Sequence, residues 1–232
     1  MKQSKTIFTL IILFLIPFFG SSQIVEDKLG AWYMYTWSAN IGETPWGFQG
    51  DMQLRQWNLF GDLEQLLLRG GVTYSPKNAD IKFTLGYGNI RTGTYGSDKA
   101  TILENRIYQE ALFPNKIGNR FYLNHRFRYE QRFVENQYFR TRYRYNIFLT
   151  VPLNNTEIDE KTVYLALYNE VFINGERKIG VGRTAEVFDR NRAYAAFGYA
   201  IKKKLKVQLG VMRQITDDWG KTQLQISAHQ SF

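Results

Sequence analysis

The chain has 232 residues, with 30 Lys and Arg against 21 Asp and Glu, and its formal net charge is +9. Aromatic residues make up 16% of the sequence, an apolar load that argues against a disordered chain. There is no Cys and there are only two His, which excludes disulfides, Cys-ligated metal centres and lipid attachment through Cys. A His-rich metal site is not expected either, and we predict no metal and no cofactor.

Residues 1–22 have the three parts of a secretory signal peptide. Two lysines near the start precede an apolar run over residues 7–19, and small residues follow up to Ser22. An uncleaved membrane anchor is the alternative, but a spanning helix needs about 20 apolar residues. No later segment reaches 18 uninterrupted apolar residues. We therefore predict cleavage near Ser22, export, and one domain over residues 23–232.

From residue 30 onward, apolar and polar residues alternate with a period of two. In the clearest run, 120–133, Phe121 and Phe127 share one parity, while Arg126 and Arg128 share the other. A strand points successive side chains to opposite faces, so this run predicts a strand with one apolar and one charged face. We find no helical segment after residue 22. Eleven runs follow this pattern, at 31–41, 48–56, 64–75, 80–88, 103–113, 120–133, 138–151, 162–174, 190–202, 205–214 and a last run that ends at Phe232.

Two architectures bury such apolar faces: a soluble sandwich or lipocalin-like barrel turns them inward, and a transmembrane barrel turns them towards lipid. The runs have about the 9–11 residues that cross a bilayer at a tilt, and Trp, Tyr and Phe gather near their ends. We therefore predict an all-β fold, a single antiparallel up-and-down transmembrane β-barrel. Bacterial single-chain barrels have an even number of strands, so eleven runs are interpreted as ten or twelve strands, with twelve preferred.

The last residue, Phe232, ends a strand. A C-terminal strand with an aromatic end resembles the signal that the outer-membrane assembly machinery of Gram-negative bacteria reads. We therefore predict an outer-membrane location, with the membrane lipid and this machinery as partners. With the C-terminus in the periplasm, tracing the hairpins backward places one set of connections outside the cell, 91–101, 175–188 and 217–220, and another set inside, 77–78, 117–118 and 203–204.

The polar parity predicts a charged lumen. Two Arg-rich rows lie on adjacent strands, and like charges opposed on one sheet face are destabilising unless carboxylates interleave. One interpretation is a rigid Arg–Glu network, and the other is an electropositive passage for small anionic solutes. The predicted lumen charges are Arg55, Arg69, Glu104, Arg106, Arg126, Arg128, Glu130, Arg132, Arg140, Arg142, Arg144, Glu170 and Arg192, with Asp51 and Glu110 as further carboxylates.

The order of several charged blocks resembles the uncharacterised exported barrel family catalogued as domain of unknown function 2490. The resemblance extends over residues 30–232 and implies an outer-membrane β-barrel with no established activity. It supplies no catalytic or ligand residues to carry over. The blocks are Glu104-x-Arg106, Arg126-x-Arg128-x-Glu130-x-Arg132, Arg140-x-Arg142-Tyr143-Arg144-Tyr145, Asn169-Glu170-x-Phe172-x-Asn174 and Asn191-Arg192.

A lipid-active outer-membrane enzyme and a soluble exported ligand-binding β-barrel are the alternatives. The enzyme would need a nucleophile and a His base within hydrogen-bond reach. His125 falls on the apolar parity, and Ser227 and His229, two residues apart on one strand, are expected to lie too far apart for a direct bond. Period two separates cations from aromatics, which does not suit nucleic-acid binding. We predict a non-enzymatic barrel that binds no nucleic acid.

Overall fold

The computed structural model describes residues 29–232, so the predicted signal peptide over residues 1–22 lies outside the described residues. The described chain is folded into strands joined by short connections, and none of its segments forms a helix long and apolar enough to cross a membrane. The strands are β1 (Gly30–Asn40), β2 (Trp46–Gln56), β3 (Leu63–Tyr74), β4 (Lys82–Gly93), β5 (Thr101–Ile117), β6 (Phe121–Val134), β7 (Arg140–Pro152), β8 (Val163–Asn174), β9 (Lys178–Gly180), β10 (Arg183–Thr184), β11 (Phe188–Lys202), β12 (Leu205–Ile215) and β13 (Gly220–Ser231).

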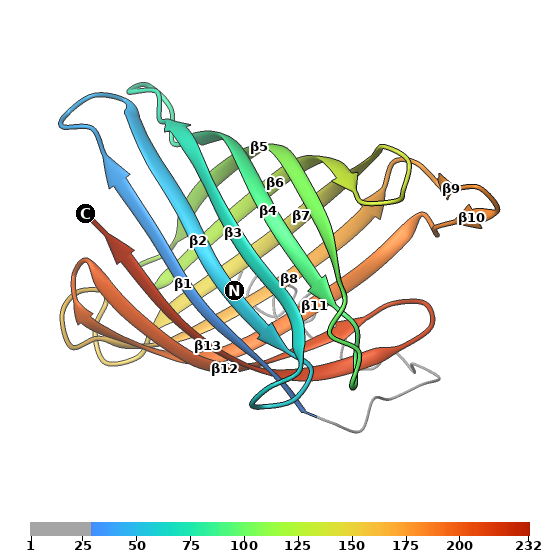
Figure 1. Ribbon diagram of the computed structural model, residues 1–232. Coiled ribbons are helices and arrows are strands. Elements are labelled where there is room, and N and C mark those ends of the chain that lie inside the picture. Colours follow the sequence, from blue (N-terminus) through green and yellow to red (C-terminus); the bar gives the residue numbers. More distant parts are fainter. Residues whose placement is uncertain (1–28) are drawn as a thin grey trace, which may run out of the picture.

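Eleven of these strands close into one barrel, in which each strand pairs with its neighbours along the chain (Figure 1). The short strands β9 and β10 form a separate two-stranded sheet in the connection between β8 and β11. Every pairing in the barrel wall is antiparallel except the one between β1 and β13, which is parallel. The parallel register runs from Gly30 opposite Gln223 to Ser38 opposite Ser231. The all-β barrel predicted from the sequence is therefore confirmed, with one parallel seam.

The expected even number of strands is corrected to eleven. The eleven alternating runs correspond one for one to the barrel strands, so none was missed or divided. In an up-and-down meander with an odd number of strands, the first and last strands point the same way. The seam between β1 and β13 therefore has to be parallel, and the two ends of the described chain lie at opposite ends of the barrel.

We call the end at which β1 begins the amino end and the end at which β13 finishes the carboxyl end. Following the strand directions, the connections over residues 94–100, 175–187 and 216–219 lie at the amino end. The connections over residues 75–81 and 118–120, and the turn between β11 and β12, lie at the carboxyl end. The two sets of connections that the sequence places on opposite sides thus lie at opposite ends of the barrel.

The outer face of the wall is apolar and exposed, as the alternation predicts. Phe197, Leu85 and Leu209 are 66%, 61% and 57% exposed, and Tyr143 is also exposed. Ile147 shares the strand face of Tyr143 and packs with neighbouring apolar side chains of the same face. The inner face carries the charged and amide side chains, most of them buried. The barrel therefore has the opposite polarity to a soluble protein, with apolar side chains outside and charges inside.

Two tyrosine rings lie across glycines of neighbouring strands on the inner face. A Cβ atom at Gly198 would lie 2.2 Å from the ring of Tyr164, its partner in the β8–β11 pairing. A Cβ atom at Gly86 would lie 2.1 Å from the ring of Tyr108. Both tyrosines are almost completely buried. Glycine at these positions therefore makes the room in which the rings fill the lumen.

Candidate functional site

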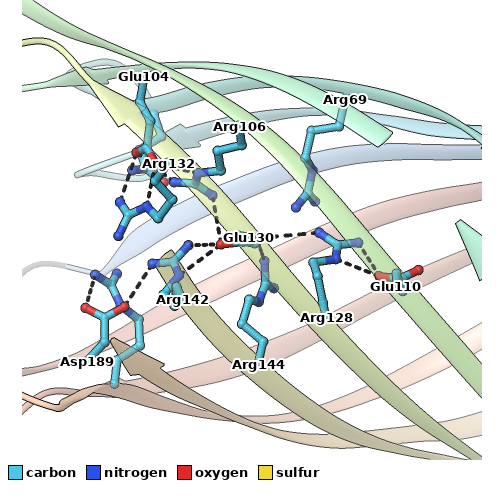
Figure 2. A network of polar contacts seen from close by, with 12 residues as sticks. Arg69, Glu104, Arg106, Glu110, Arg128, Glu130, Arg132, Arg142, Arg144 and Asp189 are labelled. Atoms are coloured by element: carbon cyan, nitrogen blue, oxygen red, sulfur yellow. Dashed lines mark hydrogen bonds and ion pairs between the residues drawn. The ribbon is translucent and has the colours of Figure 1, made fainter. Parts of the chain in front are cut away.

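Glu130 of β6 is the centre of a buried charge network inside the barrel (Figure 2). One carboxylate oxygen accepts hydrogen bonds from Arg142 Nε and Nη2 at 2.9 and 2.6 Å, and the other accepts one from Arg144 Nη1 at 2.6 Å. Arg106 Nη1 and Arg128 Nη1 lie 3.9 and 3.8 Å from the same carboxylate. Glu130 is 1% exposed, so four guanidinium groups share one carboxylate that water does not reach.

Glu104 lies on the amino-end side of Glu130 and pairs with Arg106 and with one further guanidinium group, that of Arg132. Its two oxygens accept hydrogen bonds from Arg106 Nε and Nη2 at 2.6 and 2.8 Å, and from Arg132 Nε and Nη2 at 2.5 and 3.0 Å. Arg106 and Arg132 are opposite each other in the β5–β6 pairing. Two like charges in direct cross-strand contact are thus tolerated because a carboxylate lies between them.

Two more carboxylates continue the network towards the carboxyl end. Glu110 accepts a hydrogen bond from Arg128 Nε at 2.7 Å. Glu170 accepts hydrogen bonds from Arg144 Nη2 at 2.6 Å and from Arg126 Nη2 at 2.7 Å. The predicted interleaving of Arg and Glu is therefore present, and in addition Arg69 donates from Nε and Nη2 to Asp51, each at 3.0 Å.

Three arginines of the predicted set are in the lumen but form no ion pair within 4.0 Å with a described carboxylate. Arg55 donates instead to Gln53 and Gln65, and Arg192 donates to Gln214. Both guanidinium groups lie over the ring of Trp32, with the central carbon 3.7 Å from the ring centroid for Arg55 and 4.7 Å for Arg192. Their charge is thus offset by amide oxygens and an aromatic face.

Arg140 is the third of these arginines. It is only partly buried, and its Nε has no hydrogen-bond partner in the described chain. The sequence therefore predicted the position of Arg140 on the lumen side of β7 but not its lack of a carboxylate.

The alternation in the sequence does not indicate two of the lumen carboxylates. Glu64 shares the parity of the apolar residues in its run, and Asp189 lies just before the run 190–202. Glu64 accepts hydrogen bonds from Trp32 Nε1 at 3.2 Å and from Gln223 Nε2 at 3.0 Å. Asp189 accepts a hydrogen bond from Arg142 Nη1 at 2.9 Å. At each of these positions the pairing register shifts by one residue, and the acid is the extra residue. Glu64 is the extra residue between β2 and β3, and Asp189 is the extra residue between β8 and β11. A β-bulge interrupts the alternation, so parity fails there.

The lumen holds more positive than negative charge. Eight buried Arg and Lys side chains stand against five buried Glu side chains, an excess of three positive charges. In the amino-end half of the barrel these side chains, together with Ile90, Gln214 and Gln223, are at most a few per cent exposed. A water-filled channel would expose the side chains that line it, so the buried side chains around Glu130 are packed against one another.

Towards the carboxyl end, the lumen opens into a cavity of about 420 Å³. Its lining reaches from Trp32 and Arg55 to Ser38 and Ser231 at the barrel rim. Six arginines and three carboxylates are among the lining residues: Arg55, Arg69, Arg126, Arg128, Arg144 and Arg192, with Asp51, Glu110 and Glu170. The lumen is therefore a packed charge network at one end and an electropositive cavity at the other.

Ser227 and His229 are in direct contact, which corrects the expectation that they lie too far apart. Ser227 Oγ and His229 Nε2 are 2.8 Å apart, and Thr36 Oγ1 and His229 Nδ1 are 2.7 Å apart. Side chains at positions i and i+2 leave the same strand face, and the length of the imidazole spans the gap between their backbones. Ser227 is 2% exposed and does not line the cavity, so its hydroxyl group is not presented to a substrate.

His125 lies on the outer face, where its Nδ1 is 2.8 Å from the hydroxyl group of Tyr145. Within residues 29–232, no group of three or more His, Cys, Asp or Glu side chains could hold a metal ion.

Fold and lumen together define a closed β-barrel with an apolar exterior, a charged interior and a cavity that reaches the carboxyl-end rim. A model of the family described as "Protein of unknown function (DUF2490)" matches residues 29–225, and the chain belongs to this family. The resemblance seen in the charged blocks is thereby confirmed. Comparison with curated proteins gave no match, and comparison with solved structures gave none either.

Proposed function

We propose that the mature chain is a non-enzymatic outer-membrane β-barrel of a Gram-negative bacterium, exported by the signal peptide over residues 1–22. In this proposal the Arg–Glu lumen is a rigid structural network that closes the barrel to through-passage. The observation that carries the proposal is the inverted polarity of the wall. Large apolar side chains such as Phe197, Leu85 and Leu209 are more than half exposed on the outer face, while the charges are buried inside.

Lipid is the solvent that this outer face fits best. An exposed apolar belt around a whole barrel is far larger than the isolated patches of a soluble protein. The barrel strands have 11 to 17 residues, enough to cross a bilayer at a tilt. Aromatic pairs stand near both rims, Trp46 with Tyr74 at the carboxyl end and Tyr33 with Phe60 at the amino end. Such pairs suit the girdles at the two membrane surfaces.

The packed half of the lumen favours the structural interpretation over passage. An anion crossing the barrel would have to displace Glu130 and its four arginines, which water does not reach. Breaking a buried ion pair on one side costs about 3–5 kcal/mol, and several pairs would have to break together. The excess of three buried positive charges is the feature that supports passage of small anionic solutes, and it leaves passage as the second candidate.

The enzyme alternative is not favoured by the Ser–His pair that the described chain contains. Ser227 is hydrogen-bonded to His229, but its hydroxyl group is buried and outside the cavity lining. His125 faces outward and is paired with Tyr145. The soluble ligand-binding alternative would need a largely polar outer face, and the outer face here is apolar.

Two partners belong to the proposal: outer-membrane lipid around the wall and the barrel assembly machinery at the C-terminal strand. Phe232 is 59% exposed, and its backbone N–H donates to the carbonyl oxygen of Ser38 at 2.8 Å. The aromatic ring is thus presented at the edge of the seam, where a recognition element could bind it.

Membrane fractionation and planar-bilayer recording test the two halves of the proposal. We expect the mature chain in the outer-membrane fraction, with gel migration that shifts on heating, and current across the bilayer close to the baseline. A chain that stays monodisperse in plain buffer without detergent would overturn the membrane assignment. A steady anion-favouring current, reduced when Arg126, Arg128, Arg142 and Arg144 are changed to Gln, would overturn the closed lumen and establish passage.

A further inference from the structure

We propose that the cavity at the carboxyl end is a binding pocket for a small amphiphilic organic anion, an acidic group on a flat apolar body. This inference deepens the proposed function and rests on it, because it uses the closed lumen as the floor of a blind pocket. Two neighbouring rows of lumen side chains, one cationic and one aromatic, carry the argument.

The cationic row has an arginine at each end and an asparagine and a glutamate between them, and its members are opposite one another on four neighbouring strands. Arg126 is opposite Asn146, Asn146 is opposite Glu170, and Glu170 is opposite Arg192. The side chain of Arg126 is 28% exposed, whereas those of the other ion-paired arginines in the cavity, Arg69, Arg128 and Arg144, are between 6% and 8% exposed. Arg126 is therefore the guanidinium group of this network that a ligand in the cavity can reach.

Two guanidinium nitrogens at the cavity are buried without an acceptor in the described chain, Arg126 Nε and Arg128 Nη1. The nearest carboxylate oxygens are 3.7 Å away, on Glu110, and 3.8 Å away, on Glu130. These distances are too long for hydrogen bonds. The carboxylates of the network therefore leave the guanidinium groups of Arg126 and Arg128 unsaturated, and both groups belong to residues that line the cavity.

The aromatic row lies one step nearer the carboxyl rim. Phe148 is opposite Tyr168, and Tyr168 is opposite Tyr194. The rings are stacked, with centroids 6.1 Å apart for the first pair and 4.7 Å apart for the second. On β7, β8 and β11 each ring is two residues from a member of the cationic row, on the same face. A ligand that enters from the rim head first would meet the arginines with its acidic group and the rings with its body.

Charge and size agree with such a ligand. Six arginines against three carboxylates leave the cavity walls with three excess positive charges. The volume of about 420 Å³ lies in the range of pockets that hold small organic ligands, roughly 300–1,000 Å³. Inorganic anions would use the arginines alone and leave the aromatic row without a contact. The two rows together therefore favour an amphiphilic anion.

Equilibrium dialysis of the purified full chain in an uncharged detergent tests the pocket, with 2-naphthoate as the probe and empty micelles as the baseline. We expect saturable binding of one naphthoate per barrel. The neutral analogue 2-naphthalenemethanol and inorganic phosphate are each expected to bind at least tenfold more weakly, because each lacks one of the two contacts. Equal binding of naphthoate and its neutral analogue, or no saturable binding, would overturn the proposal.

Variants locate the site. Arg126→Gln is expected to weaken naphthoate binding about tenfold or more, the effect of losing a charged hydrogen bond. The matched control is Arg120→Gln, which removes an exposed arginine from the turn at the same rim and is expected to leave binding unchanged. Heat-shifted gel migration checks that both variants are folded. Unchanged affinity in Arg126→Gln, or an equal loss in both variants, would place the probe elsewhere and end the proposal.

Failure of this inference and failure of the proposed function are distinguishable. Absence of naphthoate binding leaves the fractionation and the baseline current as expected. A current through the barrel would contradict the closed lumen of the proposed function, whereas saturable naphthoate binding would still show the binding site.

Discussion

At the scale of single residues, the stability of the lumen depends most on Glu130, since four guanidinium groups surround its carboxylate. Glu130→Gln keeps the shape of the side chain but removes the negative charge, so each of the four buried arginines keeps only its second carboxylate. We expect the free energy of unfolding to fall by about 3–5 kcal/mol, the usual effect of removing one side of a buried ion pair. Denaturant unfolding in detergent micelles, followed by tryptophan fluorescence, measures this change.

The control for this variant is Glu43→Gln, which removes one negative charge from an exposed position in the connection between β1 and β2. We expect a change within about 0.5 kcal/mol for the control, because surface substitutions away from specific contacts have small effects. A similar small change in Glu130→Gln would mean that the network does not stabilise the barrel.

The same residues show what the sequence could predict of the site. Alternation alone placed the arginine rows and the carboxylates of Glu104, Glu130 and Glu170 on one face, because parity holds wherever a strand is regular. It missed Glu64 and Asp189, which bulges turn inward. Which arginines would lack a carboxylate was not predictable either, because ion pairing depends on register between strands.

At the scale of elements, the β8–β11 pairing depends on a glycine that admits a ring. Tyr164 is 1% exposed and accepts a hydrogen bond from Gln208 Nε2 at 3.2 Å, so its ring cannot move away without losing this bond. In Gly198→Ala the new Cβ atom would lie 2.2 Å from the ring. We expect a loss of about 1–3 kcal/mol in the free energy of unfolding, the range for overpacking a buried site.

Gly70→Ala in β3 is the matched control for this prediction. A Cβ atom there meets nothing within 4 Å, so the substitution adds a methyl group without a clash. We expect the melting temperature, read from heat-shifted gel migration, to fall in Gly198→Ala and to stay the same or rise in Gly70→Ala. If the two variants melt together, the ring does not need the glycine.

The number of strands shows where an element-level rule failed. The eleven alternating runs in the sequence are the eleven barrel strands. The rule that bacterial single-chain barrels have an even number of strands does not hold for this chain. Alternation defines the two faces of a strand and carries no information on the direction of its neighbour. A parallel seam between β1 and β13 was therefore not predictable from the pattern, although it follows once eleven strands close.

At the scale of the whole molecule, the odd number of strands predicts which chain positions face the same side of the membrane. Leu29, just before β1, lies at the amino end together with Ser97, whereas Asn119 lies at the carboxyl end. An even barrel that kept the six strands after Asn119 would place position 29 at the rim of Asn119 instead. The chain has no Cys, so a single cysteine at each position reports its side without background.

With the C-terminus in the periplasm, a bulky membrane-impermeant maleimide added to intact cells is expected to label Leu29→Cys and Ser97→Cys. Asn119→Cys is expected to react only after the outer membrane is permeabilised, which also serves as the control that this cysteine is reactive. All three positions are at exposed sites, so burial does not explain a difference between them. Labelling of Leu29→Cys in step with Asn119→Cys would contradict the eleven-stranded closure, since an odd number of strands, five, separates the two positions and places them at opposite rims. Labelling of Asn119→Cys on intact cells, with the other two protected, would keep the closure and invert the barrel in the membrane, so that the cavity would open to the outside.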